Sequence, residues 1–489
     1  MQLPPIAALI GWIPLGFYLF RRYPARIAIL ANFLGGWAVL PGANYAPSAD
    51  GFPYWILGVC LPTNYLLTKA AVIGLAALAG AIFFHSADLK KFRPGLRDIP
   101  MALWCAVPLL SAATHWSTLR QGLLGAAYQT VAWGVPWVLG RIYFSQSDSL
   151  LLAAKAFVVA AVCYLPICLA EICAGPHLYA FIYGYQPYRW VGAERYIGFR
   201  PVGLLEDGNQ LGIWMAAATL IAIFLAVRRS ASRILGLPSA WGAAGLAATT
   251  LLCQSIGSLL LLALLLPLAL LRRRVFLRAS VGILVLGIVA FALFQMMDRT
   301  SLRALAQNDR AAHSIFTALT KMGRHSLAWR LAREESDMRL ALRYPLLGSG
   351  QWNWWQSGEF RPWSLWLLAL GMYGLVGLLA LGAILFLPVV SAAWSSSDGN
   401  HGESDIRQAL AAVILMLAFD NLLNGAMILP YLLLMGGLTT RSNSQPRKTP
   451  SPGLRFPVPP RLNGQLSTGF RRFKKIGLRS AAACATFNP

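Results

Sequence analysis

The sequence predicts an all-α fold, a polytopic transmembrane helical bundle with a long external loop that contains short helices. Apolar residues make up 57% of the chain and charged residues 12%, a composition far from that of soluble domains. The apolar residues fall in runs that approach the roughly 20 residues needed to cross a bilayer, and by this length rule we count about 12–13 spans. Basic residues gather in alternate turns between the runs, as on the cytoplasmic side of membrane proteins.

The basic turns fix the expected direction of each span. The first apolar run, 4–20, ends in the basic stretch 21–26, and the run 65–84 ends in a cluster of four basic residues at 90–97. The loop 41–64 between these turns has one acidic and no basic residue. Continuing this alternation along the chain, we expect further external loops at 175–208 and 298–362.

The last apolar stretch, 409–438, can be read as one long helix or as two short spans that turn at Asp420 and Asn421. The tail 441–489 carries ten basic and no acidic residues, so the charge rule favours the second interpretation, which keeps the tail in the cytoplasm. The tail is rich in Pro, Ser and Arg, and we predict that it is disordered and contacts anionic lipid head groups. We expect no nucleic-acid partner, because topology explains most of the net charge of +24.

The cysteines and acidic residues predict neither a metal site nor a cofactor. The seven cysteines have no paired spacing typical of a metal site or a disulfide framework. No Asp-x-Asp element and no histidine cluster is placed to hold a divalent ion. We therefore expect the cysteines, apart from Cys484 in the tail, to pack in the bundle.

The loop 298–362 is the longest polar interruption of the chain, with ten Lys and Arg against six Asp and Glu. Its segment 326–343 has helical spacing and places Arg330 four residues before Glu334, so ion pairing on a solvated helix accounts for part of its charge. Arg324 and Arg343 have no such obvious partner. They are candidates to bind an anion, although long external loops also carry basic residues without any function.

The loop 175–208 adds more positive charge beside the start of a predicted helix. Arg195 and Arg200 precede Asp207 and Asn209, either of which suits the N-cap of that helix. The positive end of the helix dipole then faces the same side as the arginines, so Arg200 and the helix start could share one phosphate. The alternative is that Arg200 only extends its charge to the membrane surface.

The order of these parts resembles the O-antigen ligase and O-antigen polymerase superfamily over about residues 190–440. The similar features are the Arg-Pro and Asp-Gly-Asn stretch, the long basic loop, the sequence RYPLLGSG at 343–350 and the glycine-bearing span that follows. Members of that family are metal-independent glycosyltransferases of the bacterial inner membrane. They use saccharides carried on undecaprenyl pyrophosphate at the periplasmic face.

The resemblance implies a diphosphate leaving group neutralised by arginines, with Trp352 available to stack on a sugar or to belong to the interfacial aromatic belt. Members usually carry His-Asn ahead of the glycine-bearing span, where this chain has Trp363 and Ser364. A catalytic base would then come from His313 or His325, each of which could also be a solvated bystander. The substrate-binding candidates are Arg195, Arg200, Asp207, Asn209, Arg324, Arg330, Glu334, Arg343 and Trp352.

Two other classes of function remain open. A transporter or flippase for an amphiphilic saccharide would need ionisable residues inside the membrane, and the candidates are Glu171, Asp420 and Lys155. A non-catalytic subunit of an exopolysaccharide assembly complex would tolerate the loss of His-Asn. The sequence does not separate ligase from polymerase and does not give the sugar or the oligomeric state.

Overall fold

A computed structural model describes most of the chain before the basic tail 441–489. The described residues are 2–44, 67–114, 119–186, 194–270, 278–279, 281–287, 289–290, 337–357, 362–394, 401–425 and 427–440. The chain divides into two units, Met1–Ser442 and Asn443–Pro489, and every described residue belongs to the first. The tail predicted to be disordered, 441–489, lies outside the described residues.

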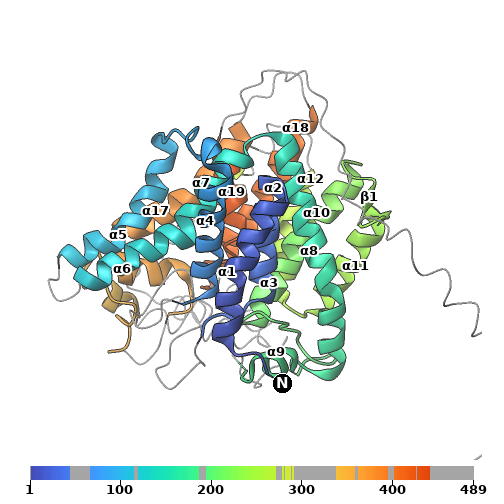
Figure 1. Ribbon diagram of the computed structural model, residues 1–489, viewed down its shortest axis with the longest axis horizontal. Helices are drawn as coiled ribbons and strands as arrows, with labels where there is room; N and C mark the ends of the chain where they lie inside the picture. Colours follow the sequence, from blue (N-terminus) through green and yellow to red (C-terminus); the bar gives the residue numbers. More distant parts are fainter. Residues whose placement is uncertain are drawn as a thin grey trace, which may run out of the picture. The chain divides into compact units, whose positions relative to one another are not determined.

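Helices are the main secondary structure of the described chain and strands are nearly absent from it, which confirms the all-α prediction (Figure 1). Five of the described helical segments are long and apolar enough to cross a membrane: α4 (Lys69–Leu89), η3 with α5 (Leu96–Ala113), α8 (Ser147–Ala174), α10 (Gly208–Val227) and α17 (Leu365–Trp394). These five segments indicate a helical membrane protein. The predicted total of about 12–13 spans is not tested by the described residues.

Other helices complete the bundle. They are α1 (Pro5–Arg22), α2 (Ala25–Leu30), α3 (Gly36–Val39), α6 (Leu119–Gln129), α7 (Val135–Tyr143), α9 (Leu178–Tyr183), α11 (Ser239–Leu252), α12 (Ile256–Leu270), α18 (His401–Asp420) and α19 (Tyr431–Thr439). The described strands, β1 (Arg233–Ile234) and β2 (Leu237–Pro238), form one short antiparallel hairpin. Because α18 ends at Asp420, the predicted turn at 420–421 is confirmed.

Two apolar segments contain a π-helical turn between α-helices. The turn η1 (Ala31–Gly35) joins α2 to α3, and η5 (Thr130–Gly134) joins α6 to α7. In η1 the buried Asn32 accepts a hydrogen bond from Trp12 Nε1 and donates one to the Ile73 carbonyl, both at 3.0 Å. Such turns disturb the regular ladder of hydrogen bonds, and here the side chain of Asn32 links three helices.

Helix α10 is the central element of the described bundle. It is apolar on all sides, and 83% of the residues in its 18-residue apolar stretch are buried inside the protein. This burial is expected for a helix without a solvent face. It packs against α8, α11, α12 and α18. Four neighbouring helices therefore hold α10 in place.

Arginines link the ends of several helices on the side of the bundle opposite the start of α10. Arg228, at the end of α10, donates to the Leu270 carbonyl at the end of α12. Arg407, in α18, donates to carbonyls at the end of α19 and to the Ser145 carbonyl before α8. These guanidinium groups satisfy carbonyls that lack an intrahelical partner. We call this side of the bundle the Arg407 end.

Helix α17 is interrupted at Gly374, whose φ of 63° and ψ of −163° are not helical. The segment 345–350 lies beside this break and replaces the missing backbone contacts with four hydrogen bonds of 2.8–3.1 Å: Ser349 N to Gly371 O, Gly350 N to Met372 O, Leu375 N to Pro345 O and Val376 N to Leu346 O. A helix can be broken at membrane depth where other backbone groups complete its hydrogen bonds.

Glycine is required on both sides of this contact. A methyl group added at Gly348 would collide with the backbone of Met372, and one added at Gly374 would collide with the backbone of Leu346. Both residues also have a positive φ, at 69° and 63°, which other residues adopt at a cost. The sequence PLLGSG is thus the part of the chain that docks into the break of α17.

We predict that Gly374→Ala destabilises the protein by about 3 kcal/mol, because the methyl group strains the backbone and separates α17 from 345–350. Unfolding in mixed micelles measures this effect. Gly382→Ala, in the same helix, is the matched control, since nothing lies within 4 Å of its added methyl group. Equal stability of the two variants would contradict the proposed role of the break.

Candidate functional site

The segment 200–207 leads into the start of α10, and its backbone is fixed by side chains of α8. Glu171 Oε2 accepts hydrogen bonds from the Val202 and Gly203 amides at 2.8 and 2.6 Å. Tyr164 Oη accepts another from the Leu204 amide at 2.6 Å. Glu171 is 3% exposed and Tyr164 is 4% exposed, so both anchors lie inside the protein and give the segment one defined path.

Arg200 is buried in this segment with fewer partners than its charge requires. It is 5% exposed, and its Nη2 donates a hydrogen bond of 2.7 Å to Asn209 Oδ1. Its buried Nε has no hydrogen-bond partner, and none of the ion pairs in the described part of the chain includes Arg200. A buried cation normally has a counter-ion, so the position favours an anionic ligand.

Gly208, the first residue of α10, packs against the Arg200 side chain. A methyl group added at Gly208 would be 2.8 Å from Arg200 Nε. Asp207 is the N-cap, as predicted: its Oδ1 accepts from the Asn209 amide and its Oδ2 from Asn209 Nδ2, both at 3.1 Å. The structure therefore brings together three predicted residues, Arg200, Asp207 and Asn209.

The cap changes one expectation drawn from the sequence. The Asn209 amide at the start of α10 already donates to Asp207, so it is not available to a phosphate. The negative charge of Asp207 also offsets the positive end of the helix dipole. An anion at this place would depend on Arg200 more than on the backbone of α10.

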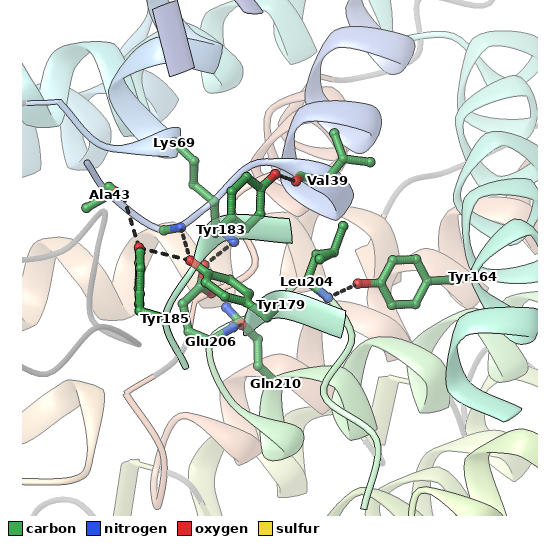
Figure 2. Close-up of polar contacts among 11 residues, drawn as sticks. Val39, Ala43, Lys69, Tyr164, Tyr179, Tyr183, Tyr185, Leu204, Glu206 and Gln210 are labelled. Atoms are coloured by element: carbon green, nitrogen blue, oxygen red, sulfur yellow. Dashed lines mark hydrogen bonds and ion pairs between the residues drawn. The ribbon is translucent and has the colours of Figure 1, made fainter. Parts of the chain in front are cut away.

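Glu206 in the same segment forms a second buried charged group with Lys69, the first residue of α4 (Figure 2). The two side chains form an ion pair and are 1% and 2% exposed. Lys69 Nζ also lies 4.0 Å from the ring centroid of Trp37, a favourable cation–π contact. Since Lys69 begins α4 and Glu206 precedes α10, the pair ties the starts of two spanning helices together.

Tyrosines from α9 and the residues after it surround this ion pair and hold the end of α3 (Figure 2). Tyr179 Oη accepts from the Gly42 amide at 3.2 Å, and Tyr183 donates to the Val39 carbonyl. Tyr185 donates to the Ala43 carbonyl at 3.3 Å. Burial, together with the neighbouring Tyr185, raises the pKa of Tyr183 to about 12, so its hydroxyl keeps its proton as a donor at neutral pH.

The other predicted site residues are only partly described. His313, His325, Arg324, Arg330 and Glu334 lie outside the described residues. Thus neither predicted catalytic base, nor the predicted ion pair of the 326–343 helix, is placed. The expected convergence of Arg200 and the basic residues of that helix on one pocket stays a prediction.

Three other predicted site residues make contacts elsewhere in the described chain. The backbone amide of Arg195 donates to the Gly198 carbonyl at 2.9 Å in a tight turn. Arg343 is exposed, with its guanidinium carbon 5.8 Å from the ring centroid of Tyr344. Trp352 packs against the core, with its ring 6.2 Å from that of Trp355. None of these contacts assigns a ligand.

Trp363 and Ser364, which stand where the family usually has His-Asn, lie at the start of α17. Ser364 is fully buried, and its carbonyl accepts from the Leu368 amide at 3.2 Å. The Leu365 amide donates to the Asn421 carbonyl at 3.1 Å. These contacts begin the helix and join it to the end of α18, which is a structural role.

Lys69 and Glu206 were not among the ionisable residues predicted inside the membrane. The predicted set, Glu171, Asp420 and Lys155, was incomplete. Two features of the sequence point to these residues: Lys69 is a lysine within an apolar run, and Glu206 directly precedes a helix cap. A charge in such a place needs a partner, but the sequence did not indicate which one.

Comparison with protein-family models, with curated proteins and with solved structures finds no match to this chain. Among the described residues, no group of three His, Cys, Asp or Glu side chains is arranged to hold a metal ion. The candidate site is therefore defined by the described residues themselves: Arg200, the Lys69–Glu206 pair and the start of α10.

We predict that Lys69→Met destabilises the protein by about 3–5 kcal/mol, because it leaves the Glu206 carboxylate buried without its partner. Unfolding in mixed micelles gives the value, and Lys69→Met with Glu206→Gln should cost less than the sum of the two single changes. Lys91→Met is the control, since Lys91 pairs with Asp88 but is 73% exposed and should cost under about 1 kcal/mol. Equal losses for Lys69→Met and Lys91→Met would contradict the role of the buried pair.

Proposed function

We propose that the protein is an O-antigen ligase-like or polymerase-like membrane glycosyltransferase that acts on a saccharide linked to undecaprenyl pyrophosphate. The observation that carries this proposal is Arg200, a buried guanidinium at the start of α10 with a free Nε. Arginine keeps its charge in apolar surroundings and binds phosphate oxygens through several N–H groups. The diphosphate of the carrier lipid is the ligand that fits this site and a membrane protein.

The proposed reaction transfers the saccharide from the diphosphate to an acceptor hydroxyl. The hydroxyl oxygen forms a bond with the anomeric carbon, the bond from that carbon to the phosphate oxygen breaks, and the diphosphate leaves with the electron pair. Arg200 would stabilise the charge that develops on the leaving diphosphate. A base takes the hydroxyl proton, and His313 and His325 are its sequence-based candidates.

The proposal places the site on the periplasmic side of a bacterial inner membrane. Arg97, Arg228 and Arg407 belong to the Arg407 end, whereas Lys69 and Arg200 lie at the other end of the spanning helices. The basic turns 21–26 and 90–97 follow the ends of α1 and α4, which pack side by side with Phe17 and Phe84 in contact. An excess of basic turns marks the cytoplasmic side, which supports a periplasmic Arg200.

Cysteine labelling tests this orientation. In a cysteine-free background, Tyr196→Cys should react with a membrane-impermeant maleimide in intact cells, because Tyr196 is 84% exposed near Arg200. Leu235→Cys, 54% exposed in the turn between β1 and β2, should react only after the membrane is opened. The reverse pattern would place Arg200 in the cytoplasm and contradict the proposal.

Binding of geranylgeranyl diphosphate to the purified full chain tests the role of Arg200. We predict that Arg200→Gln weakens binding by about tenfold or more, since charge-assisted hydrogen bonds to the phosphate are lost. Glutamine retains a donor for Asn209, so the local fold should persist. Arg229→Gln, at the exposed other end of α10, is the control and should bind as the unmodified protein does; equal affinity of Arg200→Gln would remove the basis of the proposal.

A transporter or flippase for the same lipid-linked saccharide is the second candidate, and the broken helix α17 favours it. Discontinuous helices and buried ionisable residues such as Lys69 and Glu206 occur in transporters. A purified glycosyltransferase would join saccharide units in detergent, whereas a flippase would only move the lipid between leaflets of a vesicle. A subunit of an exopolysaccharide assembly complex would do neither and would bind its partner proteins.

A further inference from the structure

Helices α1 and α4 lie side by side (Figure 1) and form a groove with a volume of about 440 Å³ toward the end of α1. This volume is in the range of small-molecule binding sites. The residues that α1 contributes follow the spacing of one helix face, so they form a continuous stripe. The groove is lined by Pro14, Phe17, Tyr18 and Arg21 from α1 and by Phe83 and Phe84 from α4.

Aromatic contacts and an interruption of α4 shape the groove. The ring of Phe17 lies edge-on to the rings of Phe83 and Phe84, with centroid distances of 5.4 and 4.7 Å. The next residue, His85, has a φ of −136° and a ψ of 29°, which are not helical. Phe83 is 72% exposed and Tyr18 is 55% exposed. The groove is therefore open on the outside of the bundle, where a membrane protein meets lipid.

Arg21 places a positive charge at one end of this groove. It is exposed in the last turn of α1, and none of the ion pairs in the described part of the chain includes it. Asp88, one turn of α4 after Phe84, already pairs with Lys91 at 2.6 Å. Pro14, at the other end of the stripe, is about 10 Å from Arg21 along the helix axis. The groove is thus basic at one end and apolar along the rest of its length.

We propose that this groove binds an anionic phospholipid, with the lipid phosphate on Arg21 and one acyl chain against the phenylalanines. A phospholipid has the same order of polarity, with its charge at the membrane surface and its chain below it. Arg21 belongs to the basic stretch 21–26, and basic residues beside span ends attract anionic head groups. Tyr18 has an apolar ring and a polar tip, which suit the boundary between the two parts of the lipid. This inference does not depend on the proposed function.

The competing explanation is that Arg21 only contributes to a general positive surface and that the aromatic residues only pack α1 against α4. Such a surface attracts anionic lipids through any of its basic residues. Arg22 separates the two explanations, because it is also exposed at the end of α1 but does not line the groove. A specific site depends on Arg21, whereas a general surface depends on both arginines alike.

Photo-crosslinking of the purified full chain in phosphatidylcholine nanodiscs tests the site. The two probes are a phosphatidylglycerol and a phosphatidylcholine with the same diazirine-bearing acyl chain, and mass spectrometry maps the labelled residues. We expect the phosphatidylglycerol probe to label the groove about fivefold more than the phosphatidylcholine probe. Arg21→Gln should bring this ratio close to one. Arg22→Gln, the matched control, should leave the ratio unchanged.

Phe83→Ala tests the apolar part of the groove. Because Phe83 is 72% exposed, its truncation should leave the fold intact while removing a contact of the acyl chain. We expect phosphatidylglycerol labelling of the groove to fall. Ile82→Ala is the matched control, since Ile82 is the preceding residue of α4 and is 49% exposed but does not line the groove.

Equal labelling by the two head groups, or an equal loss in Arg21→Gln and Arg22→Gln, would overturn the inference. Labelling spread evenly over the helices outside the groove would also overturn it. A third contrary result is displacement of the phosphatidylglycerol probe by geranylgeranyl phosphate but not by unlabelled phosphatidylglycerol, because the groove would then bind a prenyl phosphate. None of these results involves Arg200, so failure of this inference is distinct from failure of the proposed function.

Discussion

Arg200 is 5% exposed, and its guanidinium donates one described hydrogen bond, to Asn209. In an apolar bundle every buried polar group must find its partner within the protein or in a ligand. Lys69 meets this demand through Glu206 and Trp37, whereas Arg200 meets it only in part. This difference between the two buried cations separates a structural contact from a candidate binding site.

The fold explains why the segment can hold a charge in this position. Helix α10 is enclosed by four helices, and α8 fixes the backbone of 202–204 through Glu171 and Tyr164. The tyrosines after α8 hold the end of α3 beside the start of α4. The Lys69–Glu206 pair then joins α4 to α10. The loop segment that carries Arg200 is thus anchored to several spanning helices, which keeps Arg200 in one geometry.

The sequence predicted those features that depend on neighbouring residues. Apolar runs gave the helices, Asp207 gave the cap of α10, and charge distribution gave the turn at Asp420. The Lys69–Glu206 pair was not predictable, because the two residues are far apart in the chain and either could have paired elsewhere. The break at Gly374 was hidden for a similar reason, since glycine is common in membrane helices and the segment that completes its hydrogen bonds comes from another part of the chain.

The bond pattern around Arg200 also limits which functions are physically reasonable. An enzyme, a flippase and an assembly subunit would each use the same helices, and in each case the proposed lipid-linked diphosphate would supply a counter-charge for Arg200. The broken helix α17 and the docked segment 345–350 provide a second rigid element.

An experimental structure of the protein in nanodiscs with geranylgeranyl diphosphate tests this account most directly. We predict density for the diphosphate beside Arg200, near the start of α10. A carboxylate of the protein bound to Arg200 in place of the ligand, or the diphosphate bound far from α10, would contradict it.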